Sequence, residues 1–338
     1  MTTQEIADEF VSSEIQAKMT EVHNKLQKAK SEIGKVLVGQ ETMITLLLES
    51  LLSKGHVLLE GVPGIGKTLL IRALSEILDG VYSRVQFTPD LLPSDIVGVR
   101  AYEKDKGFFT LKGPVFANFV MGDEINRAPP KVQSALLQAM QEKEVTIGKE
   151  TFDLPNPFFV MATQNPLDHQ GTYSLPQAQM DRFLFKINMS YPTIESEQKI
   201  LENNITLDSF ESFELKKIFT NDSLLAAQEL VNEIYIDEKL KNYIVRIIDA
   251  TRNPETYDLP SVKKYVSYGA SPRGSIALFI AAKSRALINN RPYVTYKDIK
   301  ELVYPTLRHR IILNFEGQAA GITTDDVIDE ILQKLPLM

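Results

Sequence analysis

A glycine-rich stretch between a short apolar run and a helical pattern is the strongest constraint in this sequence. Residues 61–68 read Gly-Val-Pro-Gly-Ile-Gly-Lys-Thr and match the pattern G-x-x-x-x-G-K-[ST]. The apolar run 56–60 predicts a strand before it, and residues 67–78 predict a helix after it. In this arrangement backbone N–H groups and the helix N-terminus point at phosphate oxygens. The sequence therefore predicts a phosphate-binding loop that opens an α/β domain.

Further strands and helices alternate after this loop. Near-continuous apolar runs predict strands, and amphipathic spacing predicts a helix over residues 130–141. Strands of this kind are typical of a parallel sheet that is buried on both faces. The sequence therefore predicts a three-layer αβα core of the P-loop NTPase type. The predicted strands are 56–60, 81–86, 119–122, 158–163 and 183–187.

The strand pattern stops after residue 187, and helical pattern continues to the end of the chain. A length of 338 residues suits two domains. We expect a core with N-terminal helices and inserted hairpins over 1–190, and a small all-α lid domain over 191–338. The insertions are 87–117, with a hairpin signal at 107–113, and 144–154, which alternates around Gly148. Thr323 and Asp326 predict a capped last helix.

Composition excludes several kinds of site. The chain has no cysteine, so disulfides, thiolate metal sites and cysteine nucleophiles are absent. Its four histidines lack metal-ligand spacing. The net charge of −7 does not favour duplex nucleic acid, which rewards a basic face. No secretory signal and no long apolar run is visible, so we expect a cytoplasmic protein.

Four side chains are the first candidates for chemistry at this loop. Lys67 should reach the β- and γ-phosphates of a nucleotide, and the Thr68 hydroxyl should ligate Mg²⁺. The strand 119–122 leads into Asp123 and Glu124, and ligands of open α/β sheets bind at such strand ends. We expect Asp123 to hold the Mg²⁺ and Glu124 to polarise the attacking water.

Three more polar residues follow at informative places. Asn165 comes after the strand 158–163, where its amide would orient water between Glu124 and the γ-phosphate, although Asn-Pro is also a turn signal. Arg182 precedes the last strand and would stabilise charge on a transferring phosphoryl group, with a salt bridge to a carboxylate as the alternative. Arg273 opens a helix, where a cation is unfavourable unless it has an anionic partner, which could be a phosphate or equally a carboxylate.

In chain order these residues resemble the signature set of AAA+ ATPases. The phosphate loop corresponds to Walker A, Asp123 and Glu124 to Walker B, Asn165 to sensor 1, Arg182 to the arginine finger and Arg273 to sensor 2. More narrowly, the chain resembles the MoxR family. That resemblance lies in residues 60–68, 122–130, 162–166, 175–183 and 269–274, and it covers all but about the first 30 residues.

The resemblance implies more than the residues alone. It implies ATP and Mg²⁺ as cofactors, hydrolysis of ATP to ADP and phosphate, and a ring, typically a hexamer, with ATP between subunits. Arg182 would then act on the neighbouring subunit's γ-phosphate, and Arg273 would report the nucleotide state through the lid. The expected nucleotide contacts are Gly39, Gln40, Gly61, Val62, Pro63, Gly64, Ile65, Gly66, Lys67, Thr68 and Leu69.

The resemblance also implies chaperone-like remodelling or assembly of protein complexes, or metal-cofactor insertion, often beside partners with a von Willebrand factor A domain. A motor acting on nucleic acid is the alternative, and it predicts basic hairpins. The lysines of both insertions are interleaved with acidic residues, which argues against strong binding along the phosphate backbone of a nucleic acid. A phosphotransferase would not explain Glu124 or Arg182. A nucleotide-gated scaffold without turnover would not explain why every hydrolytic position is filled.

Overall fold

Five strands form one sheet in the computed structural model, in the order β2, β5, β8, β1, β9. Their bounds are β1 Val57–Gly61, β2 Tyr82–Gln86, β5 Phe119–Asp123, β8 Phe159–Gln164 and β9 Phe185–Met189. The pairs β2–β5, β5–β8 and β1–β8 are parallel. All five predicted strands are present, with ends shifted by at most two residues. The α/β prediction is confirmed.

The structure describes residues 12–62, 64–105, 107–166, 171–202 and 210–336, and these divide into two compact units. The sheet unit comprises 27–183 and 187–226, and the helical unit comprises the rest. Helix α2 (Ser13–Val36), helix α9 (Asn221–Leu230) and strand β9 contribute residues to both. Segments of the two units alternate along the chain, so this division does not test a single boundary after residue 190. That boundary stays a prediction. Across the described residues, no helix is long and apolar enough to span a membrane.

Helices cover both faces of the sheet. Leu58 and Val120 belong to one core cluster with Leu136 of helix α6, while the alternate residues Leu59 and Met121 are fully buried as well. Because successive strand side chains point to opposite faces, burial at both sets means that neither face meets water. The helices of this unit are α3 Glu41–Leu52, α4 Lys67–Ile77, α5 Pro93–Val97, η1 Ile125–Arg127, α6 Pro130–Glu142, α7 Gln177–Met180, α8 Ile194–Glu202 and η2 Phe210–Phe213.

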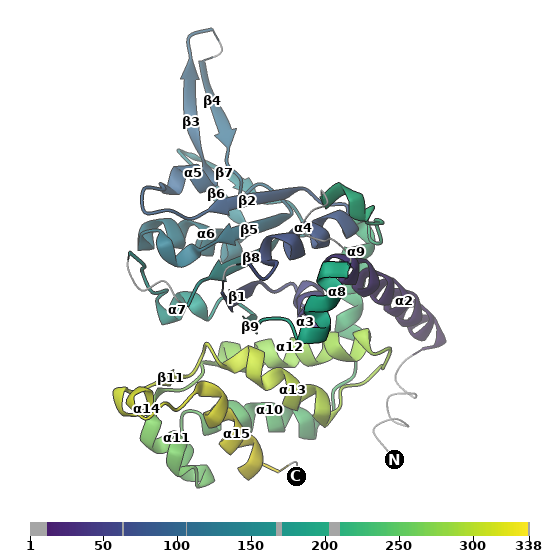
Figure 1. The fold of residues 1–338 in the computed structure, drawn as a ribbon, viewed down its shortest axis with the longest axis vertical. Helices are drawn as coiled ribbons and strands as arrows, with labels where there is room; N and C mark the ends of the chain where they lie inside the picture. The colour runs from purple at the N-terminus through teal and green to yellow at the C-terminus, as the bar shows by residue number, and fades with distance from the viewer. Residues whose placement is uncertain (1–11, 63, 106, 167–170, 203–209, 337–338) are drawn as a thin grey trace. The chain divides into compact units, whose positions relative to one another are not determined.

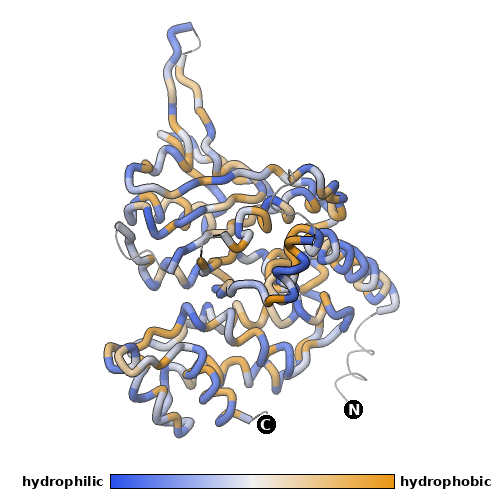
Figure 2. The backbone as a smooth tube through the Cα atoms, in the orientation of Figure 1, coloured by the Kyte–Doolittle hydropathy of each residue, from blue (hydrophilic) through white to orange (hydrophobic). Residues whose placement is uncertain are grey.

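Two hairpins interrupt the sheet unit, one within each predicted insertion. The hairpin signal at 107–113 is wrong in its bounds, because this segment forms a single strand whose partner strand lies before it. Strands β3 (Gly98–Glu103) and β4 (Gly107–Lys112) pair antiparallel, as do β6 (Glu144–Ile147) and β7 (Glu150–Asp153). The β3–β4 hairpin projects away from the sheet in Figure 1. Figure 2 shows hydrophobic and hydrophilic stretches alternating along it, and several of its apolar side chains are exposed.

The helical unit is built around helices α10, α12 and α13. Its last helix begins at a capping box, because Thr323 Oγ1 accepts from the N–H of Asp326 (3.1 Å) and the Asp326 carboxylate accepts from the N–H of Thr323 (2.8 Å). One short strand pair, β10–β11, is the exception to the helical prediction. The elements are η3 Val231–Glu233, α10 Glu238–Ala250, η4 Pro254–Tyr257, α11 Pro260–Tyr265, β10 Val266–Tyr268, α12 Pro272–Ile288, α13 Tyr296–Leu307, β11 Ile312–Leu313, α14 Phe315–Ala319 and α15 Thr324–Lys334.

Candidate nucleotide site

The glycine-rich loop joins β1 to the first turn of α4. Gly64 and Gly66 have φ angles of +82° and +85°, a region that glycine adopts without steric cost. Gly66 is the residue that precedes α4, so the free N–H groups of the first helical turn lie at the loop. The loop therefore has the backbone shape and the helix terminus that bind anions.

Gly61 fixes how closely the loop approaches the last strand. A Cβ atom at this position would lie 2.8 Å from Ile65 Cδ1, 2.9 Å from Met189 Cβ and 3.0 Å from the Met189 carbonyl oxygen. Real Cβ atoms essentially never come within 3.0 Å of another heavy atom, and the position of Met189 Cβ is fixed by the backbone of β9. Only glycine fits where β1 turns into the loop.

Lys67 is half-buried at the base of the loop. Its amine donates to the carbonyl of Gly61 and to that of Gln164 (3.4 Å). Burial lowers the pKa of Lys67, and the nearby carboxylates of Asp123 and Glu124 oppose that shift. A partly desolvated cation is therefore held within the loop, where it can exchange carbonyl partners for phosphate oxygens.

Asp123 and Glu124 end strand β5 and are linked by one hydroxyl. Thr163 Oγ1, at the end of the neighbouring strand β8, donates to Asp123 Oδ1 (2.6 Å) and accepts from the backbone N–H of Glu124 (2.9 Å). Glu124 has a φ of +56°, a conformation that is uncommon outside glycine. The backbone therefore turns sharply after Asp123, and the bonds to Thr163 fix the positions of Asp123 and the Glu124 backbone relative to each other.

Both acids also have hydrogen-bond partners on strand β2 and in the helix η1 that follows Glu124, and sequence reasoning missed these partners. Arg84 Nη2 donates to Asp123 Oδ2 (2.6 Å) and to Gln86 Oε1 (3.0 Å). Gln86 Nε2 in turn donates to Glu124 Oε2 (3.2 Å), which also accepts from Arg127 Nη1 (3.0 Å). The one available signal was the polar alternation of Arg84 and Gln86 along the strand 81–86.

One cavity of about 340 Å³ brings the predicted loop and both acids together. Its lining residues are Gly64, Gly66, Lys67, Thr68, Leu69, Asp123, Glu124 and Asn165. A second cavity of about 300 Å³ shares Gly64, Gly66 and Leu69 with the first, so the two are contiguous. It is lined by Val36, Leu37, Val38, Gln40, Gly64, Ile65, Gly66, Leu69, Tyr191, Pro192, Glu197 and Ile200, and it is more apolar.

The contiguous cavities suit a nucleotide whose phosphates lie at the loop and whose base lies against apolar side chains. A threonine hydroxyl and a carboxylate are hard oxygen ligands, which is the donor set that Mg²⁺ prefers. The loop, Thr68 and Asp123 therefore fit an Mg²⁺-bound nucleoside triphosphate. Sequence reasoning missed the contribution of helix α8 through Glu197 and Ile200, because nothing in the sequence brings that segment to residues 36–40.

The remaining predicted residues lie outside these two linings. Gly39 lies in the chain between the lining residues Val38 and Gln40, Gly61 and Val62 line neither cavity, and Pro63 lies outside the described residues. Arg182 Nη1 donates to the carbonyl of Leu137 (2.6 Å). The predicted role of Arg182 stays a prediction.

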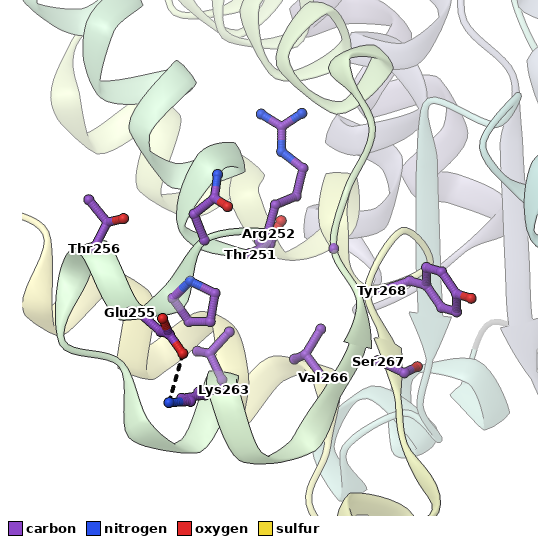
Figure 3. Close-up of a pocket in the computed structure, with 12 residues that line it drawn as sticks. Thr251, Arg252, Glu255, Thr256, Lys263, Val266, Ser267 and Tyr268 are labelled. Atoms are coloured by element: carbon purple, nitrogen blue, oxygen red, sulfur yellow. Dashed lines mark ion pairs between the residues drawn. The ribbon is translucent and has the colours of Figure 1, made fainter.

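Arg273 belongs to the helical unit and is exposed at the start of α12, where its N–H donates to Ser271 Oγ (3.1 Å). A further cavity of about 520 Å³ lies in the same unit (Figure 3). Its charged groups include the ion pair of Lys263 with Glu255 (2.7 Å), and it lacks a glycine-rich loop. Neither the exposed Arg273 nor this cavity identifies a ligand for the helical unit.

Comparison with known proteins identifies the same two parts of the chain. The family described as "ATPase family associated with various cellular activities (AAA)" matches residues 56–185, and the AAA lid domain matches residues 261–331. The crystal structure of a protein from Cytophaga hutchinsonii, described as a candidate ATPase, superposes with a TM-score of 0.89 at 47% identity. That similarity covers 95% of this chain and 97% of the other.

Two curated relatives are informative at the level of the whole chain. Chaperone MoxR1 of Mycobacterium tuberculosis is 46% identical over 318 residues, which is 94% of this chain and 83% of the relative. Protein MoxR of Methylorubrum extorquens is 30% identical over 340 residues, which is 95% of this chain and 97% of the relative. With these relatives and the two matching domains, the chain belongs to the MoxR family of AAA+ ATPases.

Proposed function

We propose that this protein hydrolyses ATP to ADP and phosphate with Mg²⁺ and uses that reaction to remodel or assemble protein complexes. The observation that carries the proposal is the cavity of about 340 Å³, because Lys67, Thr68, Asp123, Glu124 and Asn165 all line it. These residue types supply a phosphate cradle, metal ligands and a group that can orient water. Membership of an ATPase family supports the same reaction.

The mechanism assigns a separate task to each side chain. Bound Mg²⁺ would neutralise phosphate charge, held by Thr68 and Asp123. Glu124 would orient water for in-line attack on the γ-phosphate, with the Asn165 amide steering the same water. Lys67 would stabilise the charge that develops on the phosphate oxygens. Arg182 would do so from a neighbouring subunit, in a ring that is typically a hexamer.

Two observations favour a protein client over nucleic acid. The β3–β4 hairpin exposes aromatic side chains near its tip, with Tyr102 at 64% and Phe108 at 66% exposure. Exposed apolar groups of this kind bind protein surfaces, whereas a nucleic-acid motor would present unpaired cations. The word "chaperone" in the name of the relative MoxR1 agrees with a protein client. Metal-cofactor insertion and a partner with a von Willebrand factor A domain are finer proposals of the same kind.

The first prediction tests the hydrolytic assignment. Glu124→Gln keeps the size of the side chain and its bond to Arg127 or Gln86 but cannot act as a base. We expect ATP affinity within about threefold of the unaltered chain and turnover reduced about a hundredfold or more. ATP binding is measured by calorimetry and turnover by phosphate release.

A matched control comes from the same unit. Glu142 is exposed at the end of α6, where it accepts a local bond from Gln138 (2.7 Å), so Glu142→Gln should leave both binding and turnover unchanged. Full turnover in the Glu124→Gln variant would remove Glu124 from the mechanism. A trapped Glu124→Gln complex with ATP can then be recovered with its bound client. Recovery of a protein supports remodelling, and recovery of nucleic acid alone contradicts it.

A further inference from the structure

One carboxylate stands apart in the more apolar of the two contiguous cavities. Among the described residues that line this cavity of about 300 Å³, Glu197 is the only charged one. The other lining residues are apolar or, in Gln40 and Tyr191, uncharged. A carboxylate here opposes an anionic ligand, because like charges repel. A nucleotide therefore gains from Glu197 only if its base donates a hydrogen bond to that carboxylate.

The first turn of helix α8 brings Glu197 to this cavity. The preceding residue, Ser196, is 9% exposed and packs so closely on Gly39 that no Cβ atom fits there. The N–H of Glu197 donates to the carbonyl of Thr193 (2.8 Å), and Thr193 Oγ1 accepts from the N–H of Ser196 (3.3 Å). Within the described part of the chain, no side chain donates a hydrogen bond to the Glu197 carboxylate, so it can accept one from a ligand.

The position of the glycine-rich loop determines which edge of a purine base meets α8. Gly64, Gly66 and Leu69 line both cavities, whereas Glu197 lines only the one that does not contain Lys67. A nucleotide with its phosphates at Lys67 therefore enters this cavity from the sugar side. The sugar joins the base at N9, and the edge with N1 and the substituent at C6 lies opposite N9. That edge is directed away from the loop, toward Glu197.

The polar side chains in this cavity differ in how well they can distinguish one purine from another. The Gln40 amide has both donors and an acceptor, so it can turn to suit either base, and its Nε2 lies 3.5 Å from the Ser190 carbonyl. The ionised carboxylate of Glu197 can only accept. Adenine carries a donating amine at C6, whereas guanine carries an accepting oxygen there. A carboxylate that faces C6 therefore attracts adenine and repels guanine.

We propose that Glu197 selects adenine by accepting a hydrogen bond from the N6 amine of the base. This rests on the proposed function, because it takes the glycine-rich loop as the phosphate site. It deepens that function by assigning the choice of nucleotide to one side chain of α8. Guanine would satisfy the carboxylate only through N1–H and the 2-amine, in a different pose, so the preferred nucleotide tells the two poses apart.

The test compares the dissociation constants of ADP and GDP for the full chain in excess Mg²⁺, measured by calorimetry. The unaltered chain should bind ADP at least about tenfold more tightly than GDP. Glu197→Gln keeps the size of the side chain but adds an NH₂ group that can donate to the guanine oxygen. The ratio of the two constants should therefore fall about tenfold. Loss of repulsion from the phosphates affects both nucleotides equally and cancels in the ratio.

Glu202 supplies the matched control on the same helix. It is exposed at the end of α8 and lines neither cavity, so Glu202→Gln makes the same change of charge away from the base. This variant should keep the ratio of the unaltered chain within about twofold. An unchanged ratio in Glu197→Gln, or an unaltered chain that prefers GDP, overturns the proposal.

A nucleotide without the amine tests the contact from the side of the ligand. Purine riboside 5′-diphosphate has hydrogen in place of the N6 amine and should bind the unaltered chain about tenfold more weakly than ADP. In Glu197→Ala the two nucleotides should bind within about twofold of each other, because the partner of the amine is gone. Equal losses in both proteins would show that the amine bonds to another group, which contradicts the assignment.

Lys67→Ala separates this inference from the proposed function. If this variant binds neither ADP nor GDP, the loop is the phosphate site, and the ratio in Glu197→Gln alone decides the role of Glu197. If Lys67→Ala binds both nucleotides as the unaltered chain does, the loop is not the phosphate site. The proposed function then fails, and the assignment of Glu197 fails with it.

Discussion

At the scale of single residues, the candidate site depends on contacts between neighbouring strands. The bonds that Thr163 makes to Asp123 and to the Glu124 backbone cross from β8 to β5. The bonds of Arg84 and Gln86 reach the same acids from β2. The two acids are therefore held from both sides by side chains that only the sheet order β2–β5–β8 brings together.

His56 gives a prediction on acid stability. It is 5% exposed at the start of β1, where Nδ1 accepts from the Val160 N–H (3.0 Å) and Nε2 lies 3.2 Å from the Met140 carbonyl. Burial lowers the pKa of His56 from 6.5 to about 4. Because the folded state resists protonation, stability is intact above the unfolded pKa and is lost as pH falls toward the folded pKa. We expect a loss of about 2 kcal/mol between about pH 7.5 and pH 5 from this residue.

The measurement is chemical denaturation at both pH values, with His56→Gln as the matched variant. Glutamine can keep one donor and one acceptor but does not titrate, so its stability should lack this part of the pH dependence. The difference in the free energy of unfolding between the unaltered protein and the His56→Gln variant should therefore become smaller as the pH falls. If this difference in unfolding free energy is the same at both pH values, His56 does not cause the loss of stability in acid.

Sequence reasoning could identify Lys67, Thr68, Asp123 and Glu124 because their signals are local. A glycine pattern in a strand, loop and helix, or two acids after an apolar strand, needs no knowledge of distant contacts. Thr163, Arg84 and Gln86 could not be assigned in this way. Their partners lie 38 to 40 positions away in sequence, and they become neighbours only through the pairing of the strands.

At the scale of elements, two glycines near the end of α2 predict opposite effects on stability. Gly39 has a φ of +76°, and a Cβ atom there would lie 2.1 Å from Ser196 Oγ in helix α8. Gly39→Ala should therefore cost about 1–3 kcal/mol and weaken nucleotide binding beside Gln40. Gly34 lies within α2 with no atom within 4 Å of its would-be Cβ, so Gly34→Ala should stabilise the protein by about 0.5–1 kcal/mol.

Denaturation of both variants in parallel checks this pair. The double variant Gly39→Ala with Ser196→Gly separates the two causes, because it removes the clash with α8 but leaves the unfavourable φ. Partial recovery is the expected outcome. Equal stabilities for Gly39→Ala and Gly34→Ala would contradict the close approach of residue 39 to α8.

The elements themselves were largely predictable, and the exceptions have physical causes. Parallel strands buried on both faces stand out as apolar runs, and Gly148 at φ +67° marks the turn of the β6–β7 hairpin. The β10–β11 pair has only three and two residues per strand, which is too short for any alternation to be visible. The approach of α8 to Gly39 depends on tertiary packing and has no local signal.

At the scale of the whole molecule, a shared site between subunits predicts complementation. Arg182 Nη1 donates to the Leu137 carbonyl, while Nε is buried without a hydrogen-bond partner among the described residues. A partly satisfied guanidinium can exchange these surroundings for an anion at modest cost. In a ring, Arg182 of one subunit would meet the phosphate loop and Glu124 of the next.

Arg182→Ala and Glu124→Gln should each be nearly inactive alone, yet a mixture should recover turnover. In a randomly mixed ring with equal amounts of both, about a quarter of the interfaces would combine an intact Glu124 with an intact Arg182. We therefore expect up to about a quarter of the unaltered turnover, measured by phosphate release after subunit exchange. The control mixes Arg182→Ala with a subunit that carries both Arg182→Ala and Glu124→Gln. No subunit of this mixture has an intact Arg182, so no interface is complete and the mixture should stay inactive. Absence of recovery, when subunit exchange is verified by labelled protein, would place Arg182 outside any shared site.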